Sequence, residues 1–119
     1  MKTFSVMLAQ LNPTVGDLQN NAKKLLEAYF EARSAKVNLV AFPEMFLTGY
    51  QAQDLVTKEA FLDDVSKTLS SVAASISGGP PLVVGAPSKE GDLIYNAYFL
   101  LFNGCATVVS RKHHLPNDD

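Results

Sequence analysis

The chain of 119 residues is long enough for one domain with a hydrophobic core, and 47% hydrophobic and 18% charged residues exclude a disordered chain. The formal net charge of -2 gives no basic excess for nucleic-acid binding, and no apolar run is long enough for a membrane span. The single cysteine, Cys105, excludes an internal disulfide, and without a secretory signal pattern we expect a cytoplasmic protein.

The first predicted elements form a β-α-β unit. Residues 3–10 alternate between polar and apolar side chains and then become apolar throughout. This pattern predicts a strand, which we place in the centre of the sheet. Asp17 is a good N-cap for the helix that follows. Its apolar positions recur at steps of three and four residues: Leu18, Ala22, Leu25, Tyr29 and Ala32. Residues 39–42 predict a second buried strand, which a right-handed crossover makes parallel to the first.

A second helix is predicted over residues 58–77. The sequence Gly78-Gly79-Pro80 ends it, because glycine favours helix termini and proline cannot continue the helix. Its buried stripe comprises Phe61, Val65, Leu69, Val72 and Ile76.

The last part of the chain predicts three strands in succession. Residues 81–85 are a third buried strand, and the polar turn at residues 88–92 leads to no further helix. Residues 94–102 and 105–111 predict an antiparallel hairpin, because the Asn103-Gly104 pair between them is a strong signal for a two-residue turn. The predicted order is therefore β-α-β-α-β-β-β, an α/β chain with a mixed sheet.

This order leaves one face of the predicted sheet uncovered. Two helices can cover only one face, yet residues 97–102 are apolar at every position. A large exposed apolar face indicates a missing partner. We expect either the rest of a longer chain or another subunit of a homo-oligomer to cover it.

Glu44 is the first candidate for a chemical role. Pro43 ends the strand at residues 39–42 because it has no N–H to give to the sheet, so Glu44 lies just past the carboxyl end of a buried strand. Ligands and reactions of α/β proteins are found at this edge. The apolar residues that follow Glu44 leave its carboxylate little water, which favours a general base. The alternative is a strand-ending glutamate that points into solvent.

Three stretches, taken in order, resemble the carbon-nitrogen hydrolase (nitrilase) superfamily, and more narrowly its glutaminase domains in glutamine-dependent NAD synthetases. They are AQLNPTVGD at residues 9–17, FPEMFLTGY at residues 42–50 and RKHHLPN at residues 111–117. VVGAP at residues 83–87 and the pair Tyr95-Asn96 lie between them. The resemblance implies the first half of a nitrilase-type α-β-β-α sandwich, whose second sheet would cover the bare face.

The resemblance also implies the site residues. The family uses a Glu, a Lys and a Cys: the Glu corresponds to Glu44, as general base, and the Lys to Lys112, as stabiliser of the oxyanion. Tyr50 lies in the loop that shapes the substrate pocket. Glu44 and Lys112 must then converge on one pocket. Without the resemblance, Lys112 reads as an ordinary exposed strand end.

The catalytic cysteine of the family comes after the lysine, on a strand-to-helix turn, and we expect it to be absent from this chain. Cys105 precedes Lys112 and follows a hairpin turn, so we interpret it as a small core residue. Residues 1–119 are then the N-terminal part of one carbon-nitrogen hydrolase domain, incomplete at the C-terminus and inactive alone. We expect no metal site, because His113 and His114 have no further ligand at suitable spacing.

The predicted function is therefore that of part of a glutamine amidohydrolase, which takes glutamine as its small-molecule substrate. It would supply ammonia for the ATP-dependent amidation of deamido-NAD to NAD, with ATP and magnesium bound only in a separate synthetase domain. Two alternatives remain. One is a fragment of a free-standing amidase or nitrilase, and the other is a non-catalytic module that dimerises through its bare sheet face.

Overall fold

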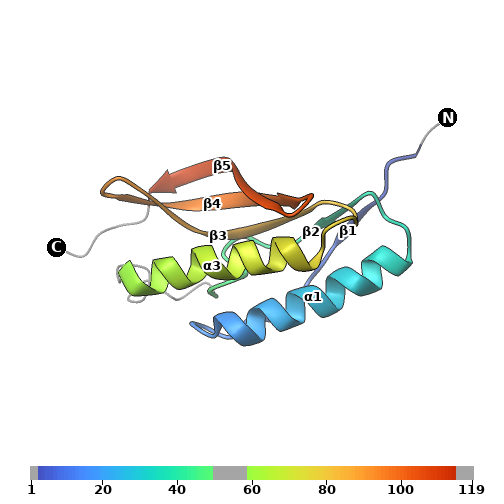
Figure 1. Cartoon of the computed structure of the whole chain (residues 1–119), viewed down its shortest axis with the longest axis horizontal. Coiled ribbons are helices and arrows are strands. Elements are labelled where there is room, and N and C mark those ends of the chain that lie inside the picture. Colours follow the sequence, from blue (N-terminus) through green and yellow to red (C-terminus); the bar gives the residue numbers. More distant parts are fainter. Residues whose placement is uncertain (1–2, 50–58, 115–119) are drawn as a thin grey trace.

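The computed structural model contains a single mixed sheet with helices against one face (Figure 1). It describes residues 3–49 and 59–114, and for residues 113 and 114 it describes the backbone alone. The described elements follow the predicted order β-α-β-α-β-β-β. The helices are α1 (Leu18–Ser34) and α3 (Glu59–Ser75). The strands are β1 (Val6–Leu8), β2 (Leu39–Ala41), β3 (Leu82–Glu90), β4 (Leu93–Phe102) and β5 (Cys105–His114).

The strands lie side by side in the order β1-β2-β3-β4-β5. β1, β2 and β3 are parallel, whereas β3, β4 and β5 are antiparallel. The parallel β-α-β unit is thus confirmed, but the central position predicted for the first strand is wrong, because β1 lies at one edge of the described sheet. Its apolar residues Val6 and Leu8 are 45% and 71% exposed, so their apolar character reflects an uncovered face and not a central position.

The first helix is capped and packed largely as predicted. Asp17 Oδ1 accepts a hydrogen bond of 3.1 Å from Asn20 N, which satisfies one of the free N–H groups at the start of α1. Leu18, Leu25, Tyr29 and Ala32 are buried, but Asn21 is fully buried where the apolar pattern placed Ala22. A polar residue occupies this core position because the neighbouring loops need its hydrogen bonds.

Asn21 connects two loops that come together at one end of the sheet. Its Nδ2 donates to Thr14 O at 2.7 Å and to Leu47 O at 2.9 Å, and its Oδ1 accepts from Thr14 N at 2.7 Å. The backbone of Gly16 also donates to Thr48 O at 2.8 Å. The loop before α1 is thereby attached to the loop after β2, which carries Glu44.

The second helix and the hairpin depart only slightly from prediction. Leu62 takes the buried place expected for Phe61, and Ile76 is buried just past the end of α3. β3 continues to Glu90, through the polar residues that predicted an earlier turn, because they pair with β4 as far as Leu93. Asn103 and Gly104 have φ of 54° and 81°, the left-handed values that a two-residue hairpin of this kind requires.

The predicted bare face is confirmed, since both described helices lie on the same side of the sheet (Figure 1). The other side contains a shallow apolar hollow of about 530 Å³, to which all five strands or the residues that follow them contribute. Its lining includes Leu8, Phe42, Val83, Tyr98 and Val109. Neither described helix is long and apolar enough to cross a membrane.

Candidate active site

Glu44 begins a tight turn at the carboxyl end of β2, as predicted. Phe46 N donates to Pro43 O at 3.3 Å, and Gly49 N donates to Met45 O at 2.9 Å. Met45 has a φ of 54°, a left-handed conformation that is uncommon for a side chain of this size. Phe46 and Leu47 are fully buried, and this packing offsets the cost of the strained residue, which is about 1–3 kcal/mol. The turn is therefore held in one conformation.

Gly85 of β3 gives this turn its place on the sheet. Gly85 N donates to Pro43 O at 3.2 Å, and Gly85 O accepts from Leu47 N at 3.3 Å. A Cβ at position 85 would lie 2.6 Å from Glu44 Cα, closer than real contacts allow. The backbone of Glu44 thus rests directly on a residue without a side chain.

Lys112 reaches Glu44 from the other end of the sequence. Its Nζ lies 3.1 Å from Glu44 Oε2, although the two residues are 68 positions apart. The pairing of β4 with β5 passes from Asn96↔His113 to Ala97↔Arg111, so Lys112 is an extra residue in a bulge. A bulge redirects a side chain and is common beside active sites. The side chains of Lys112 and Glu44 are 53% and 29% exposed, which leaves the pair accessible from solvent.

Asn96 of β4 is the residue at this site to which the sequence analysis gave no role. It is 6% exposed, and its Nδ2 donates a hydrogen bond to Glu44 Oε1. The sequence did contain a signal for Asn96, because it is a lone amide within an otherwise apolar strand and buried polar groups normally have a partner. The sequence could not name that partner, because it depends on how β2 and β4 are spaced across β3.

The structure thus brings two of the three predicted site residues together. Tyr50, expected to shape the substrate pocket, lies outside the described residues. In the described ranges, no group of three or more His, Cys, Asp or Glu residues is placed to hold a metal ion.

Cys105 requires a correction, because it is exposed and not part of the core. It begins β5, directly after the hairpin turn and opposite Phe102, which is also exposed. Lys112 is seven residues further along the same strand, and a strand rises about 3.3 Å per residue, so the two lie on the order of 20 Å apart. Cys105 is therefore not part of the site around Glu44.

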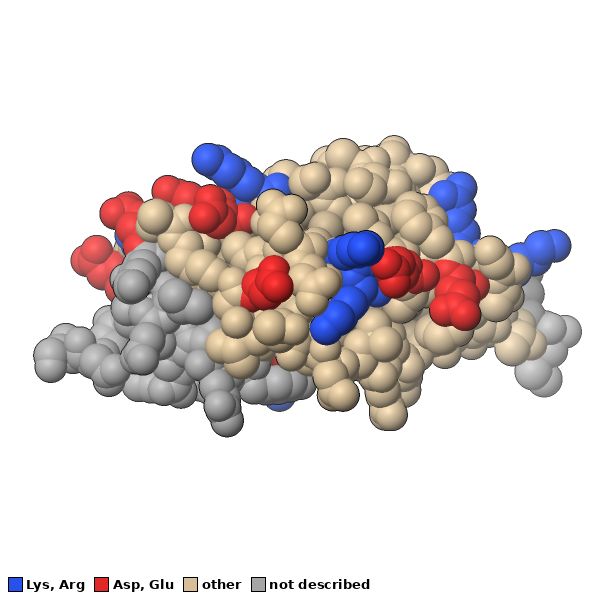
Figure 2. Space-filling model, turned by 90° about the horizontal axis from the view of Figure 1, so that it is seen from below, with Lys and Arg blue, Asp and Glu red and all other residues tan. Residues whose placement is uncertain are grey.

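Other charged groups form surface pairs. Arg111 Nε donates to Glu90, and this hydrogen bond raises the pKa of the Arg111 guanidinium above its usual value. Lys89 Nζ lies 3.4 Å from Glu59 Oε1 and joins β3 to the start of α3. On the face seen in Figure 2, acidic side chains gather toward the left end, and basic and acidic side chains alternate over the rest of a largely uncharged surface.

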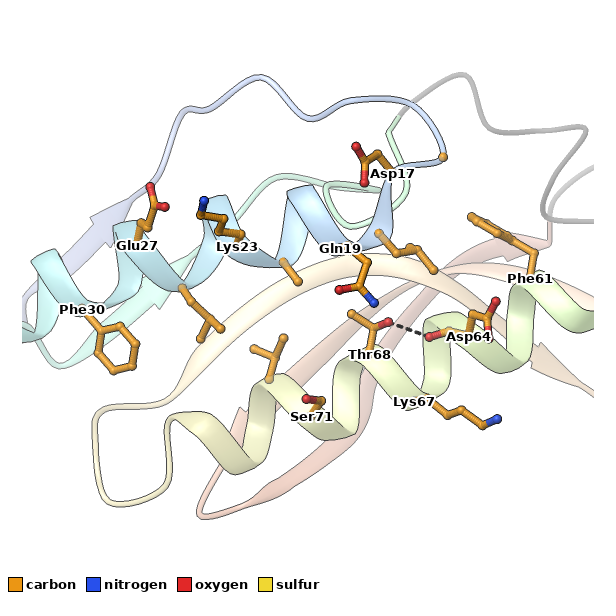
Figure 3. Close-up of a pocket in the computed structure, with 15 residues that line it drawn as sticks. Asp17, Gln19, Lys23, Glu27, Phe30, Phe61, Asp64, Lys67, Thr68 and Ser71 are labelled. Atoms are coloured by element: carbon orange, nitrogen blue, oxygen red, sulfur yellow. Dashed lines mark hydrogen bonds between the residues drawn. The ribbon is translucent and has the colours of Figure 1, made fainter.

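A second hollow, larger than the one on the bare face, lies between the two helices (Figure 3). It measures about 990 Å³, and neither Glu44, Asn96 nor Lys112 lines it. Its walls mix charged and aromatic side chains, such as Lys23 and Phe30 of α1 with Asp64 of α3. This groove contains no convergent set of groups suited to catalysis.

Comparison of the sequence with known families identifies the family of this chain. The family model for carbon-nitrogen hydrolases matches residues 5–119. The chain belongs to the carbon-nitrogen hydrolase family. The resemblance seen in three short stretches is thus confirmed over almost the whole chain, and the predicted nitrilase-type fold is confirmed with it by the solved structures that this chain matches.

Two synthetases and an amidase are similar to this carbon-nitrogen hydrolase chain. It is 49% identical over 116 residues to glutamine-dependent NAD(+) synthetase of Rhodobacter capsulatus, covering 98% of the chain and 21% of the relative. A solved glutamine-dependent NAD(+) synthetase from Cytophaga hutchinsonii has a TM-score of 0.87 and 30% identity, with 98% of this chain and 20% of that chain covered. An amidase from Nesterenkonia sp. has a TM-score of 0.73 and 22% identity, with 91% and 41% covered, which shows a shared fold alone.

The chain therefore spans about a fifth of the length of the synthetases that it matches. Within each of these synthetases it aligns with one segment of the whole chain.

Proposed function

We propose that this chain forms part of a glutaminase domain that supplies ammonia for the ATP-dependent amidation of deamido-NAD to NAD. The observation that carries this proposal is the contact between Glu44 Oε2 and Lys112 Nζ, at 3.1 Å. It joins a carboxylate and an ammonium at the edge of the sheet where α/β proteins bind ligands. The names of the synthetase relatives supply the substrate, glutamine, and the product, NAD.

Glu44 acts as the general base. A thiol attacks the carboxamide of glutamine as its thiolate, and Glu44 takes the proton as the new carbon–sulfur bond forms. That proton passes to the leaving amine, so ammonia departs and a thioester remains. Glu44 then takes a proton from water as the water attacks the thioester. The carbon–sulfur bond breaks, glutamate is released, and Glu44 passes its proton to the sulfur, which restores the thiol.

Lys112 stabilises the charge that develops in both steps. Each attack turns a carbonyl oxygen into an oxyanion. Where the assembled site excludes water, an ammonium at hydrogen-bond distance lowers the barrier by about 3 kcal/mol, as a single oxyanion-hole donor does. The contact with Glu44 holds the Lys112 ammonium beside the base. One pair of residues therefore serves both proton transfer and charge stabilisation.

The nucleophile is proposed to be a cysteine outside residues 1–119. Cys105 is exposed and lies on the order of 20 Å along β5 from Lys112, so it cannot attack a carbonyl held between Lys112 and Glu44. This chain alone is accordingly inactive. Tyr50 is proposed to contact the substrate, and ATP and magnesium to bind in a separate synthetase domain.

The bare sheet face is proposed to be an interface with the rest of a longer chain or with another subunit. Leu8 and Val109 are 71% and 53% exposed there, and apolar area of this kind is stabilised by burial at about 25 cal/mol per Å². A cytoplasmic homo-oligomer is the assembly that we propose. The free-standing amidase remains the alternative within the family.

A chimera tests the proposed function. The chain replaces its matching segment in the Rhodobacter capsulatus synthetase, to which it is 49% identical, and NAD formation is measured with glutamine and with ammonium as nitrogen source. Glu44→Gln should abolish the glutamine-supported reaction and leave the ammonium-supported one intact. Glu90→Gln, which removes a carboxylate from the surface pair with Arg111, is the matched control and should leave both intact. Equal loss of both reactions in Glu44→Gln would contradict the assignment.

A further inference from the structure

The two oxygens of the Glu44 carboxylate have different donors. Oε1 accepts a hydrogen bond from Asn96 Nδ2, and Oε2 accepts one of 3.1 Å from Lys112 Nζ. Asn96 is 6% exposed, whereas the Lys112 side chain is 53% exposed. One donor therefore belongs to the core of the sheet and the other to its surface.

These donors constrain the carboxylate to different degrees. The Lys112 ammonium is a point charge with three equivalent donors on a flexible stem, so it attracts a carboxylate without fixing its plane. The Asn96 amide is planar and has only two side-chain torsions. Its backbone is paired on both sides, with Pro87 of β3 and His113 of β5. The backbone that carries the amide is therefore held in place. Asn96 therefore determines which way the carboxylate faces.

An amide suits this position for a physical reason. A buried polar group costs free energy unless it is hydrogen-bonded, and Asn96 stands in a strand whose other residues are mostly apolar. An aspartate would place a second carboxylate against Glu44, while a leucine would leave Oε1 without its donor. Asparagine donates to a carboxylate without adding charge.

We propose that Asn96 is a positioning residue that occupies Glu44 Oε1 and so leaves Oε2, beside Lys112, as the oxygen that accepts protons. The inference rests on the proposed function, because it assigns the reacting atom of its general base. Oε2 is the oxygen next to the ammonium that stabilises the oxyanion, so proton transfer and charge stabilisation occur on the same side of the carboxylate.

The test uses two variants in the same chimera. Asn96→Leu removes the donor and keeps the volume, and we expect kcat with glutamine to fall about 100-fold, as a reacting group misplaced by about 1 Å does. KM for glutamine should change much less, and NAD formation from ammonium should not change. In Asn96→Asp, the new carboxylate at position 96 and that of Glu44 lie beside Lys112 and share one proton. When this proton is lost, the two negative charges repel each other and move apart. The alkaline limb of its kcat profile should therefore move to lower pH.

The matched control is Asn21→Asp, which alters the other buried asparagine of known partners. It should lower the melting temperature without moving the alkaline limb. A merely structural role for Asn96 would give the same result at both positions. If both Asn96 variants keep the parent's kcat and pH profile while Glu44→Gln is inactive, the positioning role is wrong and the proposed function stands. If Glu44→Gln keeps its glutamine turnover, the proposed function itself is wrong.

A second measurement needs no catalysis. In the 119-residue chain, hydrogen exchange of the Asn96 side-chain amide, followed by NMR, should be slow and should become at least tenfold faster in Glu44→Ala. Exchange that is unaffected by Glu44→Ala would overturn the proposal even if the chimeric variants fail to fold.

Discussion

Gly85 lies directly against the backbone of Glu44. A Cβ on Gly85 would come within 2.6 Å of Glu44 Cα and 2.7 Å of Glu44 C, and Gly85 N donates to Pro43 O at 3.2 Å. The turn that carries the carboxylate therefore leaves no room for a side chain at position 85 of β3. The position of Glu44 depends on β3 as much as on its own strand.

Gly85→Ala should displace Glu44 and destabilise the fold. We expect a loss of about 1–3 kcal/mol in the free energy of unfolding, the usual cost of overpacking, and at least tenfold less glutamine-supported NAD formation in the chimera. Gly91→Asn is the control: nothing lies within 4 Å of a Cβ there, and asparagine tolerates the φ of 63°. Full activity in Gly85→Ala would show that the turn does not need this close contact.

The sequence predicted the order of the elements and the pairing of Glu44 with Lys112, the latter through the family resemblance. Local patterns were sufficient for the capped helix and the Asn103-Gly104 turn, because both depend on neighbouring residues. Lys112 stands out of register in a bulge, and no local pattern shows this.

What the sequence did not show depends on contacts between distant residues. Asn96 meets Glu44 across 52 positions, and only the assembled sheet defines that contact. The apolar character of β1 was misread as central and that of Cys105 as buried. β1 was misread because apolar residues on an uncovered face have the same pattern as residues in a core. Cys105 was interpreted as a core residue because its place in the chain did not fit the nucleophile, and that place does not define its exposure.

Asn21→Ala should be more destabilising than its single side chain suggests. It leaves Thr14 N and Thr14 O without their side-chain partner at a part-buried place, and Leu47 O without its partner in the core, at about 1–3 kcal/mol for each group that finds no water. We expect a total loss of about 3 kcal/mol in urea unfolding. Asn20→Ala, one position earlier, should change stability by less than about 0.5 kcal/mol. Similar values for both would contradict the role of Asn21 in joining the loops.

The buried hydroxyl of Tyr29 should make the fold less stable at alkaline pH. Burial raises the pKa of its hydroxyl above the usual 10.0, against a smaller opposite effect of Arg33, and the hydroxyl donates to Pro80 O at 2.7 Å. Because the folded state holds this proton more tightly, the stabilisation is complete below pH 10 and falls as pH rises through the raised pKa. Tyr29→Phe should weaken this fall. The free energy of unfolding, measured from pH 8 to 11, checks it, and an unchanged slope in Tyr29→Phe would count against it.

A charge on the bare face should have different effects in the isolated chain and in the chimera. In the isolated chain, Leu8→Glu should reduce concentration-dependent association, measured by light scattering, because it places a charge on an exposed apolar surface. In the chimera the same change should reduce stability, because the proposed interface covers that surface. Phe30→Glu, at the helix groove, is the control for charge. A stable, well-defined dimer of the isolated chain would instead favour the non-catalytic module.

The most direct test of the account is a double-mutant cycle on Glu44 and Lys112 in the chimera, read as glutamine-supported NAD formation. We predict that Glu44→Gln and Lys112→Met each reduce the rate about 1000-fold or more, and that the double variant is little worse than either, because residues that act as a unit are not additive. Ammonium-supported formation should remain in all three. Independent, additive losses, or a Lys112→Met variant with the parent's rate, would contradict a catalytic pair at this site.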